Sequence, residues 1–286
     1  MTTRRGFLQA MAGGAALGAL GTPARAAGRR IPFGLQLYSL RHQLEKDVPG
    51  TLAKVKAIGF DDVETAGTYG MSVADFAAAL KEAGLAARSG HFDYQRFRDD
   101  AAGVVRDAQT LGVSFVACAW IPHEGKFNRE TALRAADVFA GAGRAAKAQG
   151  LRFAYHLHGY EWEPSPEGTL FDVLLAQSPA DLVNFEVDIL WAKAGGADPA
   201  ALIEKLKGRV PLTHLKDLAR GTTFTPPTAQ IPETANVVLG TGMLDLPAVL
   251  KAAERAGVEY HFLEDEHPES LAQLPRSLDY LRRLAG

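Results

Sequence analysis

A repeated joint, in which a helical pattern ends in glycine and an apolar run begins, constrains the fold of this chain more than any other feature. The joint occurs five times, in segments 57–60, 82–85, 110–113, 148–151 and 255–258. Glycine adopts the left-handed conformation at the end of a helix without steric cost, so the chain can turn directly into a strand. The repetition predicts an α/β domain in which helices and strands alternate.

Eight apolar runs are predicted to be strands, and amphipathic helical patterns separate them. The predicted strands are 33–38, 60–64, 85–91, 113–119, 151–156, 182–188, 210–215 and 260–264. Eight strand–helix units predict a single-domain (β/α)₈ TIM barrel, because this fold typically takes about 250 residues. The alternative is a doubly wound open sheet, which usually carries a glycine-rich nucleotide loop after its first strand. Residues 35–40 contain no glycine and therefore favour the barrel.

The first 27 residues have the pattern of a cleavable twin-arginine signal peptide. Arg4 and Arg5 precede an apolar stretch at 10–20, and Ala24-Arg25-Ala26 resembles a small-residue cleavage site. The apolar stretch is too short to span a membrane. We therefore expect residues 28–286 to form the barrel of a periplasmic or secreted protein without stable membrane insertion.

The charge balance argues against a nucleic-acid-binding or membrane-surface protein, and the cysteine content excludes a fold held by intramolecular disulfides. The formal net charge is only -2, which gives no reason to expect nucleic acid or an anionic membrane as a partner. The single cysteine, Cys118, lies in an apolar run and cannot form an intramolecular disulfide. We expect it to be a small buried hydrophobe, so that the fold relies on its apolar core.

Polar side chains close the predicted strands in the second half of the chain. In a parallel barrel the carboxyl ends of all strands meet at one face, which carries the active site. Asp188 closes the sixth strand, His214 lies near the end of the seventh, and Glu264 closes the eighth. His156 closes the fifth strand and His158 follows it. Carboxylates and imidazoles that converge in this way suit one divalent metal ion, either Mn²⁺, Zn²⁺, Mg²⁺ or Co²⁺.

Other polar and aromatic residues are expected at the same face. Glu186 shares a strand face with Asp188 but lies one layer deeper, where a buried carboxylate needs a partner. We expect it either to contact a metal ligand or to form a buried ion pair, for which Lys216 is a candidate. Glu64 and His91 close the second and third strands. The three tryptophans follow the fourth, fifth and sixth strands: Trp120, Trp162 and Trp191. Indole rings beside a polar site suit the apolar faces of sugars.

These motifs resemble those of the xylose-isomerase-like TIM-barrel superfamily of sugar phosphate isomerases and epimerases. The resemblance covers the chain after the signal and rests on segments 34–41, 59–64, 155–161, 185–191, 214–217 and 240–245. It implies one divalent metal held by Glu, Asp, His and Glu, of which the last three correspond to Asp188, His214 and Glu264. At the position of the first Glu this chain has His156, which becomes the expected ligand, with His158 or Glu161 as alternatives.

The resemblance further implies a metal-dependent sugar isomerase or epimerase that transfers a proton beside a carbonyl. Many such epimerases use both metal-bound glutamates as the acid and base, and His156 replaces one of them here. The catalytic candidates are therefore Glu161, His158, Glu264 and Lys216. The expected substrate-binding residues are Gln36, Glu64, His91, Trp120 and Trp191.

Two other functions remain open at this point. One is a metal-dependent lyase or hydrolase that acts on keto-glycosides, and the other is a non-catalytic periplasmic carbohydrate-binding barrel. In each case the expected partner is a small sugar or keto-sugar rather than nucleic acid. Homo-oligomer formation is also left open.

Overall fold

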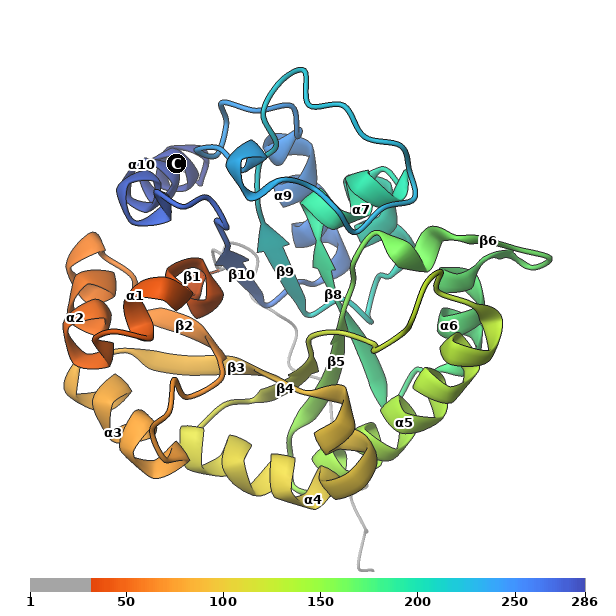
Figure 1. Ribbon diagram of the computed structural model, residues 1–286, viewed down its shortest axis with the longest axis horizontal. Coiled ribbons are helices and arrows are strands. Elements are labelled where there is room, and N and C mark those ends of the chain that lie inside the picture. Colours follow the sequence, from red (N-terminus) through yellow and green to blue (C-terminus); the bar gives the residue numbers. More distant parts are fainter. Residues whose placement is uncertain (1–31, 286) are drawn as a thin grey trace, which may run out of the picture. The chain divides into compact units, whose positions relative to one another are not determined.

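The computed structural model describes residues 32–285 and shows a closed barrel of eight parallel strands (Figure 1). The strands are β1 (Phe33–Gln36), β2 (Asp62–Ala66), β3 (Ala86–Phe92), β4 (Phe115–Cys118), β5 (Arg152–His156), β8 (Val183–Asp188), β9 (Leu212–Leu215) and β10 (Tyr260–Leu263). Their order around the barrel is β1-β10-β9-β8-β5-β4-β3-β2. The described residues form one compact unit, which confirms the single-domain TIM barrel and excludes the open sheet.

The helices surround the barrel (Figure 1). They are α1 (Arg41–Leu44), α2 (Val48–Ile58), α3 (Val73–Glu82), α4 (Tyr94–Leu111), α5 (Arg129–Ala148), α6 (Leu170–Gln177), α7 (Ile189–Gly195), α8 (Pro199–Lys205), α9 (Leu246–Ala256) and α10 (Ser270–Leu284). Short 3₁₀ helices η1 (Leu37–Leu40), η2 (Tyr160–Trp162) and η3 (Glu233–Ala235) lie in loops after β1, β5 and β9. A small antiparallel hairpin of β6 (Pro164–Ser165) and β7 (Gly168–Thr169) precedes α6.

The glycine joints have the backbone conformation that the sequence predicts. All five glycines have positive φ, for example 108° at Gly59 and 74° at Gly112. Gly59 and Gly112 are the C-caps of α2 and α4. A side chain at these positions would strain the left-handed backbone, so glycine permits the direct turn from helix to strand.

The apolar core has two layers, one between strands and helices and one inside the barrel. Phe153 of β5 belongs to the outer layer, where its ring lies 5.1 Å from that of Phe139 in α5. Phe115 and Phe262 belong to a fully buried cluster with Ala117, Ala154 and Leu212. Cys118 is also fully buried, as expected. The apolar layers leave the carboxyl ends of the strands as the place for polar groups.

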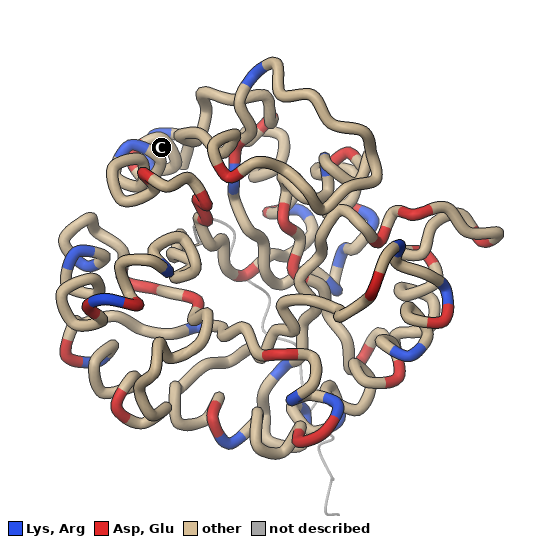
Figure 2. The backbone as a smooth tube through the Cα atoms, in the orientation of Figure 1, with Lys and Arg blue, Asp and Glu red and all other residues tan. Residues whose placement is uncertain are grey.

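Residues 1–31 and 286 are outside the part of the chain that the structure describes. The twin-arginine signal falls on these residues and therefore stays a prediction. Within residues 32–285, no helix has the length and apolar character needed to cross a membrane. Acidic and basic residues are interspersed along the outer helices (Figure 2).

Candidate metal centre and active site

Two clusters of polar side chains lie at the carboxyl ends of the barrel strands, and one histidine lies between them. We call Glu64, His91, His156 and Glu186 the inner cluster. We call Asp188, Lys216 and Glu264 the outer cluster. His214 of β9 contacts carboxylates of both. These side chains come from six different strands or the loops that follow them, so only closure of the barrel brings them together.

The inner cluster is centred on the carboxylate of Glu186. Its Oε2 atom lies 2.7 Å from His91 Nε2 and 3.2 Å from His156 Nδ1. Its Oε1 atom lies 3.3 Å from His214 Nε2. Glu64 Oε2 lies 2.6 Å from the same His214 nitrogen and accepts a hydrogen bond from Gln36 Nε2 at 2.7 Å. Three imidazoles and two carboxylates therefore face one another in a buried space.

The outer cluster is held by the start of α7 and by Lys216. Asp188 is the N-cap of α7, and its Oδ1 atom accepts hydrogen bonds from the backbone amides of Leu190 and Trp191. Its Oδ2 atom remains free to face Lys216 Nζ at 3.1 Å. Lys216 Nζ also lies 3.1 Å from Glu264 Oε2, which in turn lies 2.6 Å from His214 Nδ1.

Buried negative charge exceeds buried positive charge in these clusters. Four carboxyl groups are at most 6% exposed: those of Glu64, Glu186, Asp188 and Glu264. The two clusters contain one lysine, Lys216. Three carboxylate oxygens accept no hydrogen bond: Glu64 Oε1, Glu186 Oε1 and Asp188 Oδ2. A buried carboxylate is costly unless a cation or hydrogen bonds compensate it. The donor atoms therefore fit a divalent cation.

Two sets of donor atoms are close enough to hold an ion. One set is His91, His156, Glu186 and His214, and the other is Asp188, His214 and Glu264, with all ligand atoms of a set within 4.8 Å of one another. Imidazole and carboxylate donors suit Zn²⁺, Mn²⁺, Co²⁺ and Fe²⁺. The predicted ligand His156 belongs to the first set, and its Nε2 atom lies 4.0 Å from Asp188 Oδ2 of the second set.

Burial and mutual charge shift the pKa values of these groups. Burial raises the pKa of Asp188 to about 6, although the Lys216 ammonium acts to lower it. Burial lowers the pKa of His156 to about 3, and positive charge on His214 acts in the same direction. Burial also disfavours the charged form of His214, but nearby carboxylates, Glu186 first among them, raise its pKa well above the usual value. Without a metal, protons compensate part of the excess negative charge.

His158 lies beside His156 and is nearer to solvent, on the side of the site that we call its mouth. The two rings are 4.7 Å apart, and Trp120 and Trp191 lie 4.8 Å and 5.7 Å from the His158 ring. His158 Nδ1 has no hydrogen-bond partner, and burial lowers the pKa of this imidazole well below its usual value. The structure therefore places a neutral imidazole next to the groups that could hold a metal ion.

Glu161 lies apart from both clusters. Its Oε1 atom accepts hydrogen bonds from Tyr155 OH at 2.6 Å and from the backbone amide of His158 at 2.8 Å. Burial raises the pKa of its carboxyl group to about 8. These contacts hold the loop that carries His158. The predicted roles of Glu161 as a base or a metal ligand have no support from this arrangement and stay predictions.

The tryptophans divide into two groups. Trp120 is 40% exposed and stacks on His123, and Trp191 packs near Lys216 with the ammonium 5.3 Å from the ring centre. Both therefore contact the mouth of the site. Trp162 stacks on Phe171 of α6 instead, with ring centres 5.3 Å apart.

Sequence reasoning missed the polar contacts that loops supply. Glu266 lies two residues beyond Glu264 and pairs with Lys216 at 2.5 Å, and this alternation of acidic residues was the available signal. Glu233, in the long loop after β9, pairs with Arg41 at 2.5 Å. This ion pair joins the loops after β1 and β9 across 192 residues of sequence, which no local pattern shows.

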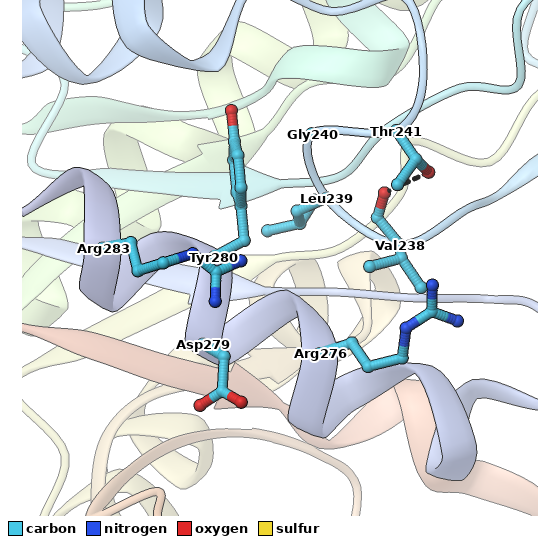
Figure 3. Close-up of a pocket in the computed structure, with 8 residues that line it drawn as sticks. All are labelled: Val238, Leu239, Gly240, Thr241, Arg276, Asp279, Tyr280 and Arg283. Carbon is cyan, nitrogen blue, oxygen red and sulfur yellow. Dashed lines mark hydrogen bonds between the residues drawn. The ribbon is translucent and has the colours of Figure 1, made fainter.

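A pocket of about 380 Å³ opens beside the inner cluster. Its lining includes Tyr38, Thr65, His91 and Arg96, so it leads from solvent to an inner-cluster imidazole. This volume suits a small molecule. Figure 3 shows a separate pocket of about 250 Å³ between α10 and the turn at 238–241, lined by residues that belong to neither cluster.

Comparisons with known proteins agree with the barrel. A family model described as "Xylose isomerase-like TIM barrel" matches residues 52–284. A solved sugar phosphate isomerase/epimerase from Parabacteroides distasonis is similar, with 24% identity, a TM-score of 0.74, and coverage of 90% of this chain and 96% of the other. An IOLI protein with a bound zinc atom shows 16% identity, a TM-score of 0.67 and coverage of 89% and 98%. An L-ribulose 3-epimerase shows 15% identity, a TM-score of 0.67 and coverage of 90% and 95%. No match is found among curated protein sequences.

Proposed function

Because this chain belongs to the xylose isomerase-like TIM barrel family, we propose that it is a metal-dependent sugar isomerase or epimerase. The reaction would transfer a proton at the carbon beside a carbonyl. The observation that carries the proposal is the buried group of Asp188, His214 and Glu264, whose donor atoms converge at the carboxyl face of the barrel. Solved structures of similar fold include sugar isomerases and epimerases, which supports the same reaction class.

The proposed catalytic ion is held by the outer ligands. Asp188 Oδ2, His214 Nδ1 and Glu264 Oε2 supply three donors, and His156 Nε2 supplies the fourth. When bound, such an ion stabilises negative charge that develops on a substrate oxygen. Lys216, which lies 3.1 Å from both carboxylates, is placed to donate a hydrogen bond to a second substrate oxygen.

His158 is the base that the geometry supports best. Its imidazole is neutral because burial lowers its pKa, and Nδ1 is free to accept a proton. Glu264 is the second candidate, since its carboxylate borders the same space. Glu161 holds the backbone amide of His158 and acts in this proposal as a positioning residue.

The proposed substrate is a small sugar or keto-sugar. The exposed ring of Trp120 and the edge of Trp191 supply apolar surfaces on which a sugar ring can lie. Gln36, Glu64 and His91 are proposed to bind sugar hydroxyls: His91 lines the pocket, and Glu64 and Gln36 are buried behind it. The Arg4–Arg5 pattern supports export to the periplasm as part of the same proposal.

A lyase or hydrolase that acts on keto-glycosides is the second candidate. One observation favours it: His156 stands where the resemblance implies a glutamate, so the outer ligands include one glutamate instead of two. An epimerase with two carboxylate bases needs both, whereas elimination needs one base and a proton donor. His158 and Lys216 would fill these two roles.

The test is solvent deuterium exchange with the full chain. The protein is stripped with chelator, reloaded with Mn²⁺, Zn²⁺ or Co²⁺, and incubated in deuterated water with a panel of sugars and keto-sugars. Metal-dependent exchange of one substrate C–H, detected by NMR, is expected for an isomerase or epimerase, and release of an aglycone would indicate the second candidate.

Asp188→Asn should abolish the exchange, because it removes a metal ligand while keeping side-chain volume. The matched control is Asp198→Asn, which changes an exposed N-cap at the start of α8. Exchange that survives both chelation and Asp188→Asn would refute the proposal.

A further inference from the structure

His156 and His214 each direct one ring nitrogen toward an inner carboxylate and the other toward an outer carboxylate. His214 Nδ1 lies 2.6 Å from Glu264 Oε2, whereas its Nε2 atom lies 2.6 Å from Glu64 Oε2. His156 Nδ1 lies 3.2 Å from Glu186 Oε2, whereas its Nε2 atom lies 4.0 Å from Asp188 Oδ2. A neutral imidazole offers one nitrogen to a metal and carries a proton on the other.

The two rings therefore couple the clusters. When a ring binds a metal on one side, its other nitrogen donates a hydrogen bond to a carboxylate on the opposite side. This is the usual arrangement of metal-bound histidine, whose second nitrogen donates to a carboxylate. With the ion on the outer side, Glu64 and Glu186 accept from the rings. With the ion on the inner side, Glu264 accepts from His214, whereas His156 Nε2 faces Asp188 Oδ2 at 4.0 Å, which is beyond hydrogen-bond distance.

We propose that the inner cluster is a second metal site, with His91 Nε2, His156 Nδ1, His214 Nε2 and Glu186 as ligands, and that it and the outer site exclude each other. The tautomers of His156 and His214 decide which site can bind. His91 belongs to the inner site alone, and Glu264 belongs to the outer site alone. The inference concerns binding and rests on the proposed function only for the assignment of the outer site.

The distances in the inner cluster are close to those of a tetrahedral site. Metal–nitrogen bonds of about 2.1 Å place neighbouring donors about 3.4 Å apart. The Glu186 oxygens lie 2.7 Å, 3.2 Å and 3.3 Å from the three imidazole nitrogens. A small outward shift of the donors would accommodate an ion. Glu186 Oε1 is fully buried, accepts no hydrogen bond and faces this space.

The two sites differ in whether a lysine or arginine already pairs with their carboxylates. In the outer cluster, the Lys216 ammonium lies 3.1 Å from both Asp188 and Glu264. An ion that binds there must compete with this ammonium, which can stay paired with Glu266. Over residues 32–285, no lysine or arginine forms an ion pair with Glu64 or Glu186. The inner carboxylates therefore lack a fixed cation of their own.

The donor sets select different ions. Three imidazoles and one carboxylate favour Zn²⁺ and Co²⁺, whereas the outer set has two carboxylates and two imidazoles, and its larger share of oxygen donors suits Mn²⁺ better. The ring of His91 lines the 380 Å³ pocket, which supplies a route for the ion from solvent. We therefore expect Zn²⁺ on the inner site and Mn²⁺ on the outer site.

The test compares metal affinities of chelator-treated full chain and two variants. His91→Gln should weaken Zn²⁺ binding about 100-fold or more and leave Mn²⁺ binding within about threefold, because only the inner site loses a ligand. Glu264→Gln should do the reverse. His42→Gln is the matched control, since that imidazole is exposed and belongs to neither cluster. Zn²⁺ and Mn²⁺ should compete for a total of one ion per chain.

X-ray absorption of the Zn²⁺-loaded wild-type chain decides the matter even when a variant does not fold. Three imidazole nitrogens around zinc are expected. Two or fewer, an unchanged Zn²⁺ affinity in His91→Gln, or two ions bound at once would overturn the inference. Because these measurements need no turnover, failure of the deuterium-exchange test would refute the proposed function and leave this inference standing.

Discussion

Removal of the Lys216 ammonium tests the charge balance of the outer cluster directly. Lys216 is 1% exposed, and its Nζ atom lies within 3.1 Å of Asp188, Glu264 and Glu266. Lys216→Met keeps the apolar stem but removes the ammonium that pairs with the buried carboxylates of Asp188 and Glu264. Breaking a buried ion pair in this way costs about 3–5 kcal/mol. For a chain of this size that loss lowers Tm by roughly 6–20 °C.

The assay is thermal and denaturant unfolding in chelator, followed by circular dichroism. Lys205→Met is the matched control, because Lys205 pairs with Asp172 at 2.7 Å on the surface with half of its side chain exposed. Such pairs contribute about 0–1 kcal/mol. Divalent metal should raise the Tm of Lys216→Met by more than it raises the wild-type Tm, because the ion replaces the missing ammonium. A loss no larger than that of Lys205→Met, or equal metal responses, would refute the reasoning.

Three further predictions concern stability and substrate binding. Burial raises the pKa of Glu161 from 4.5 to about 8, so its contribution to stability is full below the lower value and is lost as pH rises through the higher one. Glu161→Gln should therefore flatten the dependence of unfolding free energy on pH over that interval, as measured by urea titration. Trp120→Ala should raise the KM for a sugar about two- to tenfold with kcat little changed, whereas Trp162→Ala should lower stability without raising KM, since Trp120 is exposed beside the site and Trp162 packs on Phe171. Phe153→Ala should cost about 3–5 kcal/mol of unfolding free energy by denaturant titration and leave metal affinity unchanged, because the ring packs between Phe97 and Phe139 and away from both clusters.

Local patterns predicted most elements of the fold because each pattern reports on its own segment. The amphipathic patterns that separate the predicted strands are helices in the structure, among them α3 and α9. Residues 37 and 38, predicted as the end of the first strand, form η1 instead. The reason is local but involves a side chain, since Gln36 accepts a hydrogen bond from the Tyr38 amide and turns the chain. Apolar patterning cannot report such a contact.

The candidate site was predictable in composition and less so in arrangement. His156, Asp188, His214 and Glu264 lie together as the strand-end pattern predicts. Glu161 was an alternative ligand and a candidate base because it belongs to the run 155–161 that carries the resemblance, and in the structure its Oε1 atom accepts a hydrogen bond from Tyr155 OH. Neighbouring positions in a loop after a strand have no fixed side-chain direction, so proximity in sequence does not place a side chain in the site.

The sequence by itself determined that helices and strands alternate, where the glycine joints lie, and which polar residues end the strands, because these depend on local conformational preference. Only the tertiary structure decided which atoms meet. Closure of the barrel brings Glu64 to within 2.6 Å of His214, although 150 residues separate them in the chain. Strand register then places the two nitrogens of His214 between two groups of carboxylates. No sequence pattern encodes that geometry, because it arises from contacts among strands distant in the chain.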